Sequence, residues 1–168
     1  MSGAADFPSS TRPPMSPTLT QVFEACVFVS PAPELGEIGG GRRRIVPIIG
    51  GTVSGPRLEA EVLPGGADWQ TIFADGRTEV LARYTLRASD GTHIGVVNRG
   101  VRRGPAEVIR RLTAGEIVDP SEYYFRTAPV FEVGPGPHGW LLDHSFVGVG
   151  IREPDCVRLK IYAVDIDA

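Results

Sequence analysis

Asp68 and Trp69 follow a proline–glycine turn, and they are the first residues of the sequence whose types suggest chemistry. They lie in the run VLPGGADWQ, in which Gly65 and Gly66 allow the backbone to turn sharply before the next strand. At a strand mouth, Asp68 could act as a general base and Trp69 could form an aromatic wall. Asp68 could equally cap the turn by accepting a backbone hydrogen bond. The residue types alone leave both interpretations open.

Three arginines are the next residues that could contribute chemistry. Arg83, Arg99 and Arg126 each lie in a segment that resembles a β-strand. A guanidinium presents a planar fork of donors, which suits a carboxylate or the oxygen of an enolate. The alternative is ion pairing inside the protein, for example with Glu132, because the chain has 17 basic and 20 acidic residues. Only Lys160 is a lysine, and a genome rich in G and C would give the same bias toward arginine without functional meaning.

Asp143 and His144 are adjacent in a segment that we expect to be a strand. Neighbouring side chains of a strand point to opposite faces, so these two cannot form a dyad directly. On this interpretation His144 shares a face with Trp140 and Phe146 and could act as an acid or base lined by aromatic rings. A buried histidine with satisfied hydrogen bonds is the alternative.

Metal, nucleotide and cofactor signatures are missing from the sequence. The three histidines lack metal-binding spacing, and neither of the two cysteines has a partner nearby. The glycine run at residues 39–41 lacks the strand-to-helix context of a phosphate loop. We therefore expect no metal and no cofactor.

Length and charge narrow the class of protein further. The chain has 168 residues, which fits one domain, and its formal net charge of −3 argues against nucleic-acid binding through bulk positive charge. No apolar stretch approaches the ~20 residues needed to cross a membrane, and the N-terminal sequence lacks the apolar region of a secretory signal. We expect a cytoplasmic protein without nucleic-acid or membrane partners. Residues 1–19 should form a disordered tail and residues 20–168 one domain.

Glycine and proline, with 21 and 15 residues, divide the chain into short segments. Turn signals such as Asp75-Gly76 and Asp90-Gly91 recur often enough to predict an all-β protein, a single antiparallel β-barrel or a sandwich. Residues 34–43 should form a glycine-rich loop. The strands, about nine in number, are expected over residues 20–30, 44–53, 57–63, 68–73, 78–88, 92–101, 122–133, 139–151 and 155–165.

One short helix is expected near residues 105–114. Val108, Ile109 and Leu112 fall on one face of it, and Gly115 can end it. Such a helix could cover one end of a barrel.

Alternation along the expected strands sorts side chains by face, but it does not say which face lines the interior. Asn98 and Arg99, for example, fall on opposite faces. Over residues 80–87, one face carries Val80, Ala82, Tyr84 and Leu86, and the other carries Leu81, Arg83, Thr85 and Arg87. Polar and aliphatic side chains thus occur on both faces. This mixture favours a barrel whose interior holds polar groups around a small-molecule cavity.

A series of short motifs, in order along the chain, resembles a known family. The motifs are Gly50-Gly51-Thr52, Gly55-Pro56, the run from Val62 to Gln70, the run from Ala82 to Leu86, Asn98-Arg99-Gly100, the run from Tyr123 to Thr127, Pro129, Phe131-Glu132, Trp140-Leu141 and Phe146-Val147-Gly148. They cover roughly residues 20–164 and are similar to those of the DUF3237 family, also called UPF0311, of small bacterial and fungal proteins.

The resemblance implies a single antiparallel β-barrel, somewhat like the lipocalins and other calycins. It says little about activity, because the family is largely of unknown function. Two departures, Gly95 in place of a common aromatic residue and the stretch at residues 142–144, put the transfer of a ligand from relatives in doubt. The polar positions of the family match Asp68, Trp69, Arg83, Asn98, Arg99, Tyr124, Arg126 and Glu132 in this sequence.

Our first hypothesis is an enzyme without a cofactor that acts on a small carbonyl-bearing or oxygenated compound. Asp68, Glu132 or His144 would move a proton, and an arginine such as Arg83 would hold an enolate or carboxylate. The reaction would be an isomerisation, a cyclisation or an addition–elimination. The residues expected to bind the ligand are Trp69, Asn98, Arg99, Tyr124, Arg126, Trp140 and Asp143.

Two alternatives use the same residues without chemistry. The barrel could carry a hydrophobic small molecule, as barrels with a lumen often do. The polar residues could also form a structural network in a closed barrel. A homodimer through an exposed sheet face is expected in addition.

Overall fold

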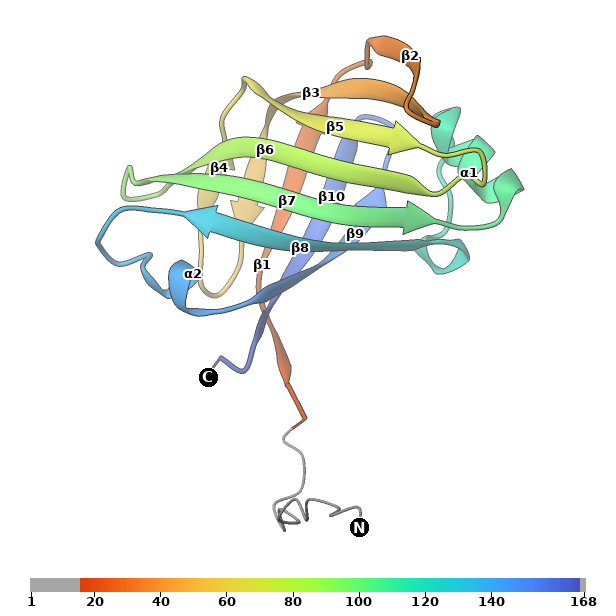
Figure 1. The fold of residues 1–168 in the computed structure, drawn as a ribbon. Helices are drawn as coiled ribbons and strands as arrows, with labels where there is room; N and C mark the ends of the chain where they lie inside the picture. The colour runs from red at the N-terminus through yellow and green to blue at the C-terminus, as the bar shows by residue number, and fades with distance from the viewer. Residues whose placement is uncertain (1–15, 167–168) are drawn as a thin grey trace, which may run out of the picture.

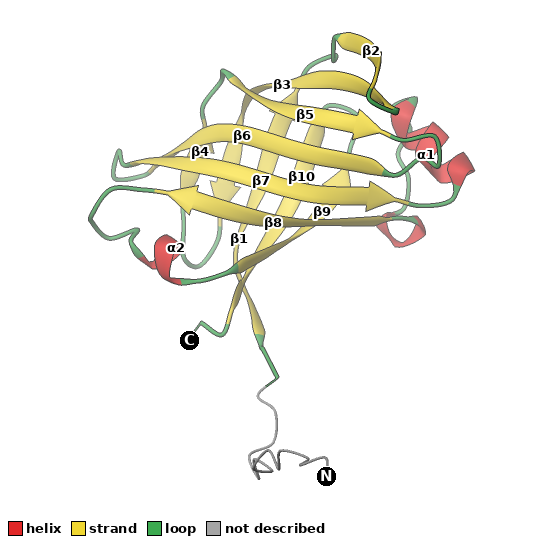
Figure 2. Ribbon diagram, viewed as in Figure 1, coloured by secondary structure: helices red, strands yellow, loops and turns green. Residues whose placement is uncertain are grey.

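The structure is a computed structural model that describes residues 16–166, and this part of the chain is built mainly of strands (Figures 1 and 2). Of the tail expected over residues 1–19, residues 1–15 lie outside the described part, and the first strand begins at Leu19. The helices are α1 (Ala106–Thr113) and α2 (Trp140–Asp143), and a 3-10 turn covers Pro120–Glu122. The strands are β1 (Leu19–Val29), β2 (Glu34–Ile38), β3 (Gly41–Ser54), β4 (Ala60–Val62), β5 (Gly66–Ile72), β6 (Thr78–Ala88), β7 (His93–Arg103), β8 (Tyr124–Glu132), β9 (Phe146–Arg152) and β10 (Cys156–Val164).

Eight of the strands close into an antiparallel barrel, which confirms the expected fold class. Around the ring the order is β1, β10, β9, β8, β7, β6, β5 and β3, and β3 closes the ring by pairing with β1. The two remaining strands are short: β2 adds to β3, and β4 pairs with both β3 and β6 beyond the end of β5. Each strand of the ring therefore has an inner and an outer face.

Two segments differ from the expected secondary structure. Residues 34–38 form β2 rather than part of a loop, because Gly39 and Gly40 adopt φ angles of 62° and 84° and turn the chain back along β3. The strand expected over residues 139–151 is instead the single helical turn α2 followed by β9. A short apolar run does not by itself distinguish a strand from a buried helical turn, and Leu141 of α2 is buried.

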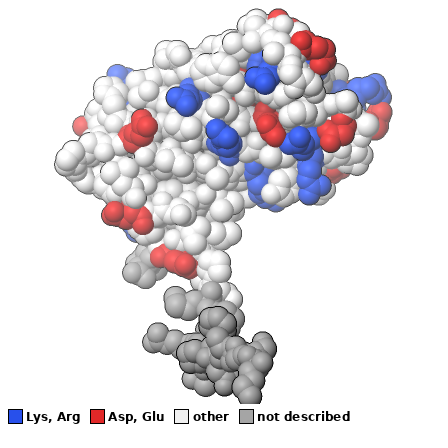
Figure 3. Space-filling view, in the orientation of Figure 1, with Lys and Arg blue, Asp and Glu red and all other residues white. Residues whose placement is uncertain are grey.

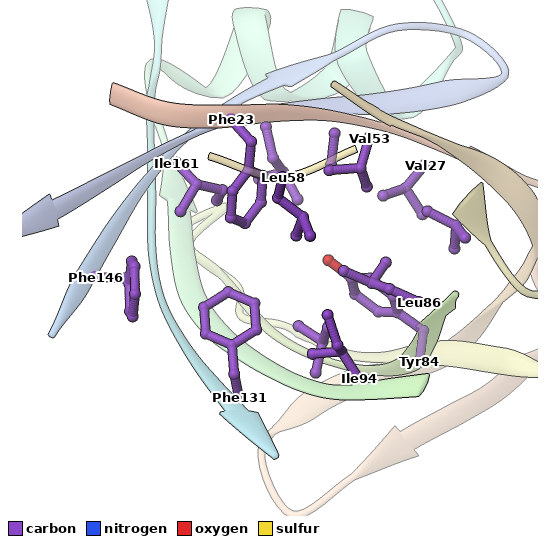
Figure 4. Close-up of a cluster of buried hydrophobic side chains, with 14 of the residues drawn as sticks. Phe23, Val27, Val53, Leu58, Tyr84, Leu86, Ile94, Phe131, Phe146 and Ile161 are labelled. Atoms are coloured by element: carbon purple, nitrogen blue, oxygen red, sulfur yellow. The ribbon is translucent and has the colours of Figure 1, made fainter. Parts of the chain in front are cut away.

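One end of the barrel interior is a packed apolar core (Figure 4). The ring of Phe131 meets the rings of Phe23 and Phe146 edge to face, with centroids 6.0 and 5.0 Å apart. Leu86 and Ile94 add aliphatic side chains that are almost completely buried. Such packing stabilises the strands at this end. It thereby positions the polar side chains that lie farther along the same strands.

Helix α1 covers the opposite end of the barrel, as the sequence predicts. Its apolar residues Val108, Ile109 and Leu112 are buried and pack in one cluster with Val80 and Phe125 from the strands beneath. The helix is amphipathic, so its other face can remain in water. Within residues 16–166, neither helix is long and apolar enough to cross a membrane.

Strand β3 changes its partner at Gly50 and Gly51. Before this point it pairs with β5, and beyond it with β4 and β1. The φ angles of the two glycines are +150° and +148°, which side chains of L-residues rarely adopt. A Cβ atom at Gly51 would also overlap the carbonyl oxygen of Cys26 on β1, whereas at Gly50 the nearest atom would be 3.8 Å away.

Gly51→Ala is therefore expected to destabilise the protein more than Gly50→Ala does. Both variants strain the backbone, at a cost of about 1–3 kcal/mol. Only Gly51→Ala also forces β1 and β3 apart, which costs a further ~1–3 kcal/mol. Unfolding in urea measures the free energy of unfolding of both variants. Equal losses would contradict the close approach of the two strands at Gly51.

Candidate active site in the barrel cavity

A cavity of about 500 Å³ occupies the barrel interior on the side of α1. It is lined by residues from all eight strands of the ring. It extends to residues 30–32, to residues 113–115 at the end of α1, and to the turn that contains Asp155. Tyr84 lies at the boundary with the apolar core, since it borders both. A cavity of this volume is in the range that holds a small organic molecule.

The strands pass from the apolar core to the cavity, and their inner side chains change character on the way. On β7 the inner residues are Ile94 in the core, followed by Asn98 and Arg102 in the cavity. On β5 they are Asp68 and Gln70. The period of two along a strand brings these side chains to one place. The polar strand residues that line the cavity are Arg44, Asp68, Gln70, Tyr84, Asn98, Arg102, Thr127 and Arg152.

Asp68 is held in a fixed orientation by two hydrogen bonds. Its Oδ1 accepts one from the backbone N–H of Leu81 at 2.9 Å, and its Oδ2 accepts one from the side-chain amide of Gln70 at 2.6 Å. Gln70 in turn accepts a hydrogen bond from Nε of Arg44 at 2.8 Å. Burial raises the pKa of Asp68 above its usual value, although the two hydrogen bonds act in the opposite direction. An oriented carboxyl group with a raised pKa is suited to proton transfer.

Arg102 places a positive charge deep in the cavity wall. The residue is 2% exposed, and burial lowers the pKa of its guanidinium to about 10, so the group stays cationic at neutral pH. Its Nε has no hydrogen-bond partner among the described residues. No carboxylate of residues 16–166 forms an ion pair with it. The ring of Phe125, centred 5.7 Å from the guanidinium carbon, is a cation–π neighbour.

Oδ1 of Asn98 and Oγ1 of Thr127 also lack a partner within the described part of the chain. Both residues are buried and line the cavity. Thr127 lies between two glycines in the register of the sheet, Gly100 on β7 and Gly148 on β9. A Cβ atom at either glycine would overlap the Thr127 side chain. The two glycines therefore make room for this side chain in the cavity wall.

Arg152 lies at the α1 end of the cavity, next to the turn between β9 and β10. Its guanidinium donates hydrogen bonds to the carbonyl oxygens of Cys156 and Pro154, at 3.1 and 3.2 Å. Asp155 in the same turn is exposed and also borders the cavity. The cavity lining thus contains three arginines and two aspartates, of which only Asp68 is enclosed.

Only two of the site residues predicted from the sequence, Asp68 and Asn98, line the cavity. Six others occupy the alternate strand positions and point outward: Trp69, Arg83, Arg99, Tyr124, Arg126 and Glu132. Because successive side chains of a strand point to opposite faces, Arg83 and Glu132 cannot join Asp68 in one catalytic group. Figure 3 shows basic side chains spread over this outer face.

Trp69, Leu81 and Arg99 lie side by side on the outer face, across β5, β6 and β7. Trp69 is 43% exposed, and all three line a groove that Leu35 of β2 also borders. The homodimer expected through an exposed sheet face stays a prediction.

Trp140, Asp143 and His144 lie at the apolar end of the barrel rather than in the cavity. Trp140 and Asp143 belong to α2, and Nδ1 of His144 shares a hydrogen bond with the carbonyl oxygen of Trp140 at 2.9 Å. The Trp140 ring packs edge-on against Phe146, with centroids 5.8 Å apart. The strand face expected to align these residues does not form, because α2 interrupts it.

Six polar strand residues of the cavity were not singled out in the sequence: Arg44, Gln70, Tyr84, Arg102, Thr127 and Arg152. A signal for two of them was present. Gln70 is two positions after Asp68, and Arg102 is four positions after Asn98, and an even spacing keeps residues on one face of a strand. No comparable signal identified Arg44, because β3 carries several arginines on both faces.

The chain belongs to the DUF3237 family, a family of β-barrel proteins. Residues 17–164 match the family model described as a protein of unknown function, DUF3237. A UPF0311 protein of Rhodopseudomonas palustris is 42% identical over 152 residues, which cover 89% of this chain and 99% of the relative. A UPF0311 protein of Clostridium acetobutylicum is 45% identical over 124 residues, which cover 74% of this chain and 78% of the relative.

Solved structures agree with this assignment. The crystal structure of a conserved protein of unknown function from R. palustris superposes with a TM-score of 0.87 at 40% identity, covering 89% of this chain and 99% of that chain. A β-barrel-like protein of Acinetobacter baumannii superposes with a TM-score of 0.80 at 34% identity, covering 93% of this chain and 100% of that chain. An enzyme from Penicillium herquei shares the fold, with a TM-score of 0.68 at 21% identity over 92% and 98%.

Arg102→Met is expected to stabilise the protein. Methionine replaces the unbranched part of the side chain and removes a buried cation that has no anionic partner among residues 16–166, so we expect a gain of about 1–2 kcal/mol and a higher Tm. Arg103→Met is the matched control, because Arg103 is the next residue of β7 and is exposed. Thermal unfolding measures the Tm of both variants and of the parent. A lower Tm for Arg102→Met would show that the guanidinium holds the barrel together.

Asp68→Asn is expected to change the dependence of stability on pH. Because burial raises the pKa of Asp68, the folded protein keeps this proton to higher pH than the unfolded chain, in which aspartate titrates near pH ~4. The unfolded state then binds fewer protons, so the parent protein loses stability relative to Asp68→Asn as the pH rises above about 4. Thermal unfolding of both proteins over a series of pH values measures this difference.

Asp119→Asn is a control in which the difference in stability from the parent should change with pH in the opposite direction. Hydrogen bonds from the backbone and side chain of Ser121 lower the pKa of Asp119, so the parent gains stability relative to this variant as the pH rises. If the parent also gained stability relative to Asp68→Asn as the pH rises, the inference that the pKa of Asp68 is raised would be wrong.

Proposed function

We propose that the barrel is a cofactor-independent enzyme that moves a proton on a small carbonyl-bearing or oxygenated organic compound bound in the cavity. The observation that carries the proposal is an oriented, enclosed carboxyl group, Asp68, in a cavity of about 500 Å³ whose wall also holds Arg44 and Arg102. The reaction would be an isomerisation, a cyclisation or an addition–elimination next to the carbonyl group. Each of these needs only proton transfer and stabilisation of an oxyanion.

Asp68 is the group that would take and return the proton. As a carboxylate it would remove a proton from the carbon next to the carbonyl group. The electron pair of the broken C–H bond forms a C=C bond, and the π electrons of the C=O bond move onto the oxygen to give an enolate. The protonated Asp68 would then return the proton to another atom of the same molecule. Because burial raises its pKa, the Asp68 carboxylate is a stronger base than an ordinary aspartate, which favours removal of the proton.

Positive charge in the cavity would stabilise the enolate. Arg44 is coupled to Asp68 through Gln70, and Arg102 lies close enough to influence the Asp68 carboxylate electrostatically. Inside the barrel, where the effective dielectric constant is lower than in water, such charges act more strongly on a developing oxyanion than they would in bulk solvent. Tyr84 points its hydroxyl into the interior (Figure 4), and burial raises its pKa, so it stays a neutral hydrogen-bond donor.

A carrier of a small hydrophobic molecule is the second candidate function. Part of the cavity wall is aliphatic and comes from Val27, Val46 and Leu159, which would bind an apolar body without any chemistry. The fungal enzyme that shares the fold supports the first candidate only to the extent that such a barrel is compatible with catalysis.

Deuterium exchange distinguishes the two candidates without a known substrate. The protein is incubated in D₂O with a panel of small cyclic and open-chain ketones and keto acids, and NMR measures the loss of protons next to the carbonyl group. We expect exchange above the buffer rate for at least one compound, and a 10²- to 10⁴-fold lower rate in Asp68→Asn, in the range of general acid–base catalysis.

Asp75→Asn is the control for this experiment, because Asp75 lies in an exposed turn, where its carboxylate accepts a hydrogen bond from the Arg77 backbone. This variant should exchange protons at the parent rate. Equal rates in Asp68→Asn and the parent would contradict the role of Asp68. Binding of a panel member without any exchange would favour the carrier.

A further inference from the structure

We propose that the ligand of the cavity is an organic anion with a carboxylate group, and that Arg102 and Thr127 bind this carboxylate. The inference rests on the proposed function only in placing the ligand in the same cavity. It assigns a binding subsite and a chemical class of ligand, and it holds for a substrate and for a carried molecule alike.

Arg102 is buried and has no anionic partner among residues 16–166. The residue is 2% exposed, its Nε has no hydrogen-bond partner in the described residues, and no carboxylate of this part of the chain pairs with its guanidinium. Taking an arginine out of water without a counter-ion is unfavourable, so a fold with only a structural need at this position would place an apolar residue there. An anion from outside the chain would complete the site.

The charges around Arg102 favour an anion as well. Arg44 from β3 and Arg152 from β9 both line the cavity and both act on Arg102 with a like charge. Asp68 from β5 opposes them, but its oxygens are already engaged by Leu81 and Gln70. The other carboxylate of the lining, in the exposed turn after β9, is at the rim of the cavity. The interior therefore carries an excess of positive charge.

Thr127 supplies a second contact of the right kind. Its hydroxyl is unpartnered within residues 16–166 and lies on the side of Gly148 of β9, while its methyl group faces Gly100, two positions before Arg102 on β7. Thr127 and Arg102 line the cavity from the neighbouring strands β8 and β7, so both can face one ligand there. A carboxylate there can accept hydrogen bonds from the Arg102 guanidinium and from the Thr127 hydroxyl, and charged hydrogen bonds of this type are strong.

The remainder of the wall indicates an organic ion rather than an inorganic one. Val80, Ala82 and Phe125 line the cavity beside Arg102, and the cavity continues to the aliphatic residues of β1 and β10. Its volume of about 500 Å³ far exceeds what a small inorganic anion fills. An apolar body attached to the carboxylate would fill this space and displace its water.

Calorimetric titration with a matched pair of probes tests the inference. The probes are naphthalene-2-carboxylate and its neutral analogue naphthalene-2-carboxamide, which differ little in shape. We expect the parent to bind the carboxylate about tenfold or more tightly than the amide, which is the effect of one or two charged hydrogen bonds. In Arg102→Met this preference should vanish while the amide still binds, and in Thr127→Val it should decrease.

Arg103→Met is the control, because Arg103 follows on the same strand but is exposed and lies 4.9 Å from the Tyr124 ring. It should keep the full preference. Neither probe has an acidic C–H group next to its carbonyl carbon, so this result is independent of the proposed proton transfer. Equal binding of the two probes by the parent would overturn the inference. So would a preference that survives in Arg102→Met, or the failure of both probes to bind at millimolar concentration.

Discussion

Closure of the sheet is the constraint on which the rest of the structure depends. Once β3 pairs with β1, every second side chain of eight strands must share a single interior. At one end this interior is filled by the aromatic cluster around Phe131, and at the other it remains a cavity. The same strands serve both ends, so the packed core determines the orientation of the polar residues. The cavity is thus a consequence of the register of the sheet rather than of any single loop.

Glycines permit this arrangement where strands or side chains approach closely. Gly51 lets β1 and β3 approach at the closure of the barrel, and Gly100 and Gly148 leave room for Thr127 in the wall. The polar end of the interior is less favourable for stability than the core. Arg102 is buried without an anionic partner among the described residues, and the partly buried Asp68 has a raised pKa. Proteins commonly retain such unfavourable groups where a ligand or a reaction requires them.

Much of the fold could be predicted from the sequence, because turn residues and period-two alternation are local signals. Helix α1 and most of the strands lie where the pattern places them, whereas α2 was mistaken for a strand because an apolar turn of helix and an apolar strand look alike over four residues. Alternation also separated Asn98 from Arg99 correctly, whereas Asp68 and Trp69 were expected at one site although they lie on opposite faces. It could not say which of the two faces is inside, since that depends on how the whole sheet curls.

Because the sequence does not show which face lies inside the barrel, the candidate site was predicted only in part. The residues that drew attention by type, such as Trp69, Arg83 and Arg126, lie mostly on the outer face, whereas Gln70 and Arg102 follow on the inner face from Asp68 and Asn98.

The claim that ties these findings together is that ligands bind inside the barrel and not on its outer face. Chemical-shift mapping of ¹⁵N-labelled protein during titration with naphthalene-2-carboxylate tests it most directly. We predict that the Nε–H signal of Arg102 and the backbone amides of Asn98 and Thr127 shift, while the indole N–H of Trp69 does not. A shift of the Trp69 indole with an unchanged Arg102 signal would contradict the account and place the site on the outer face.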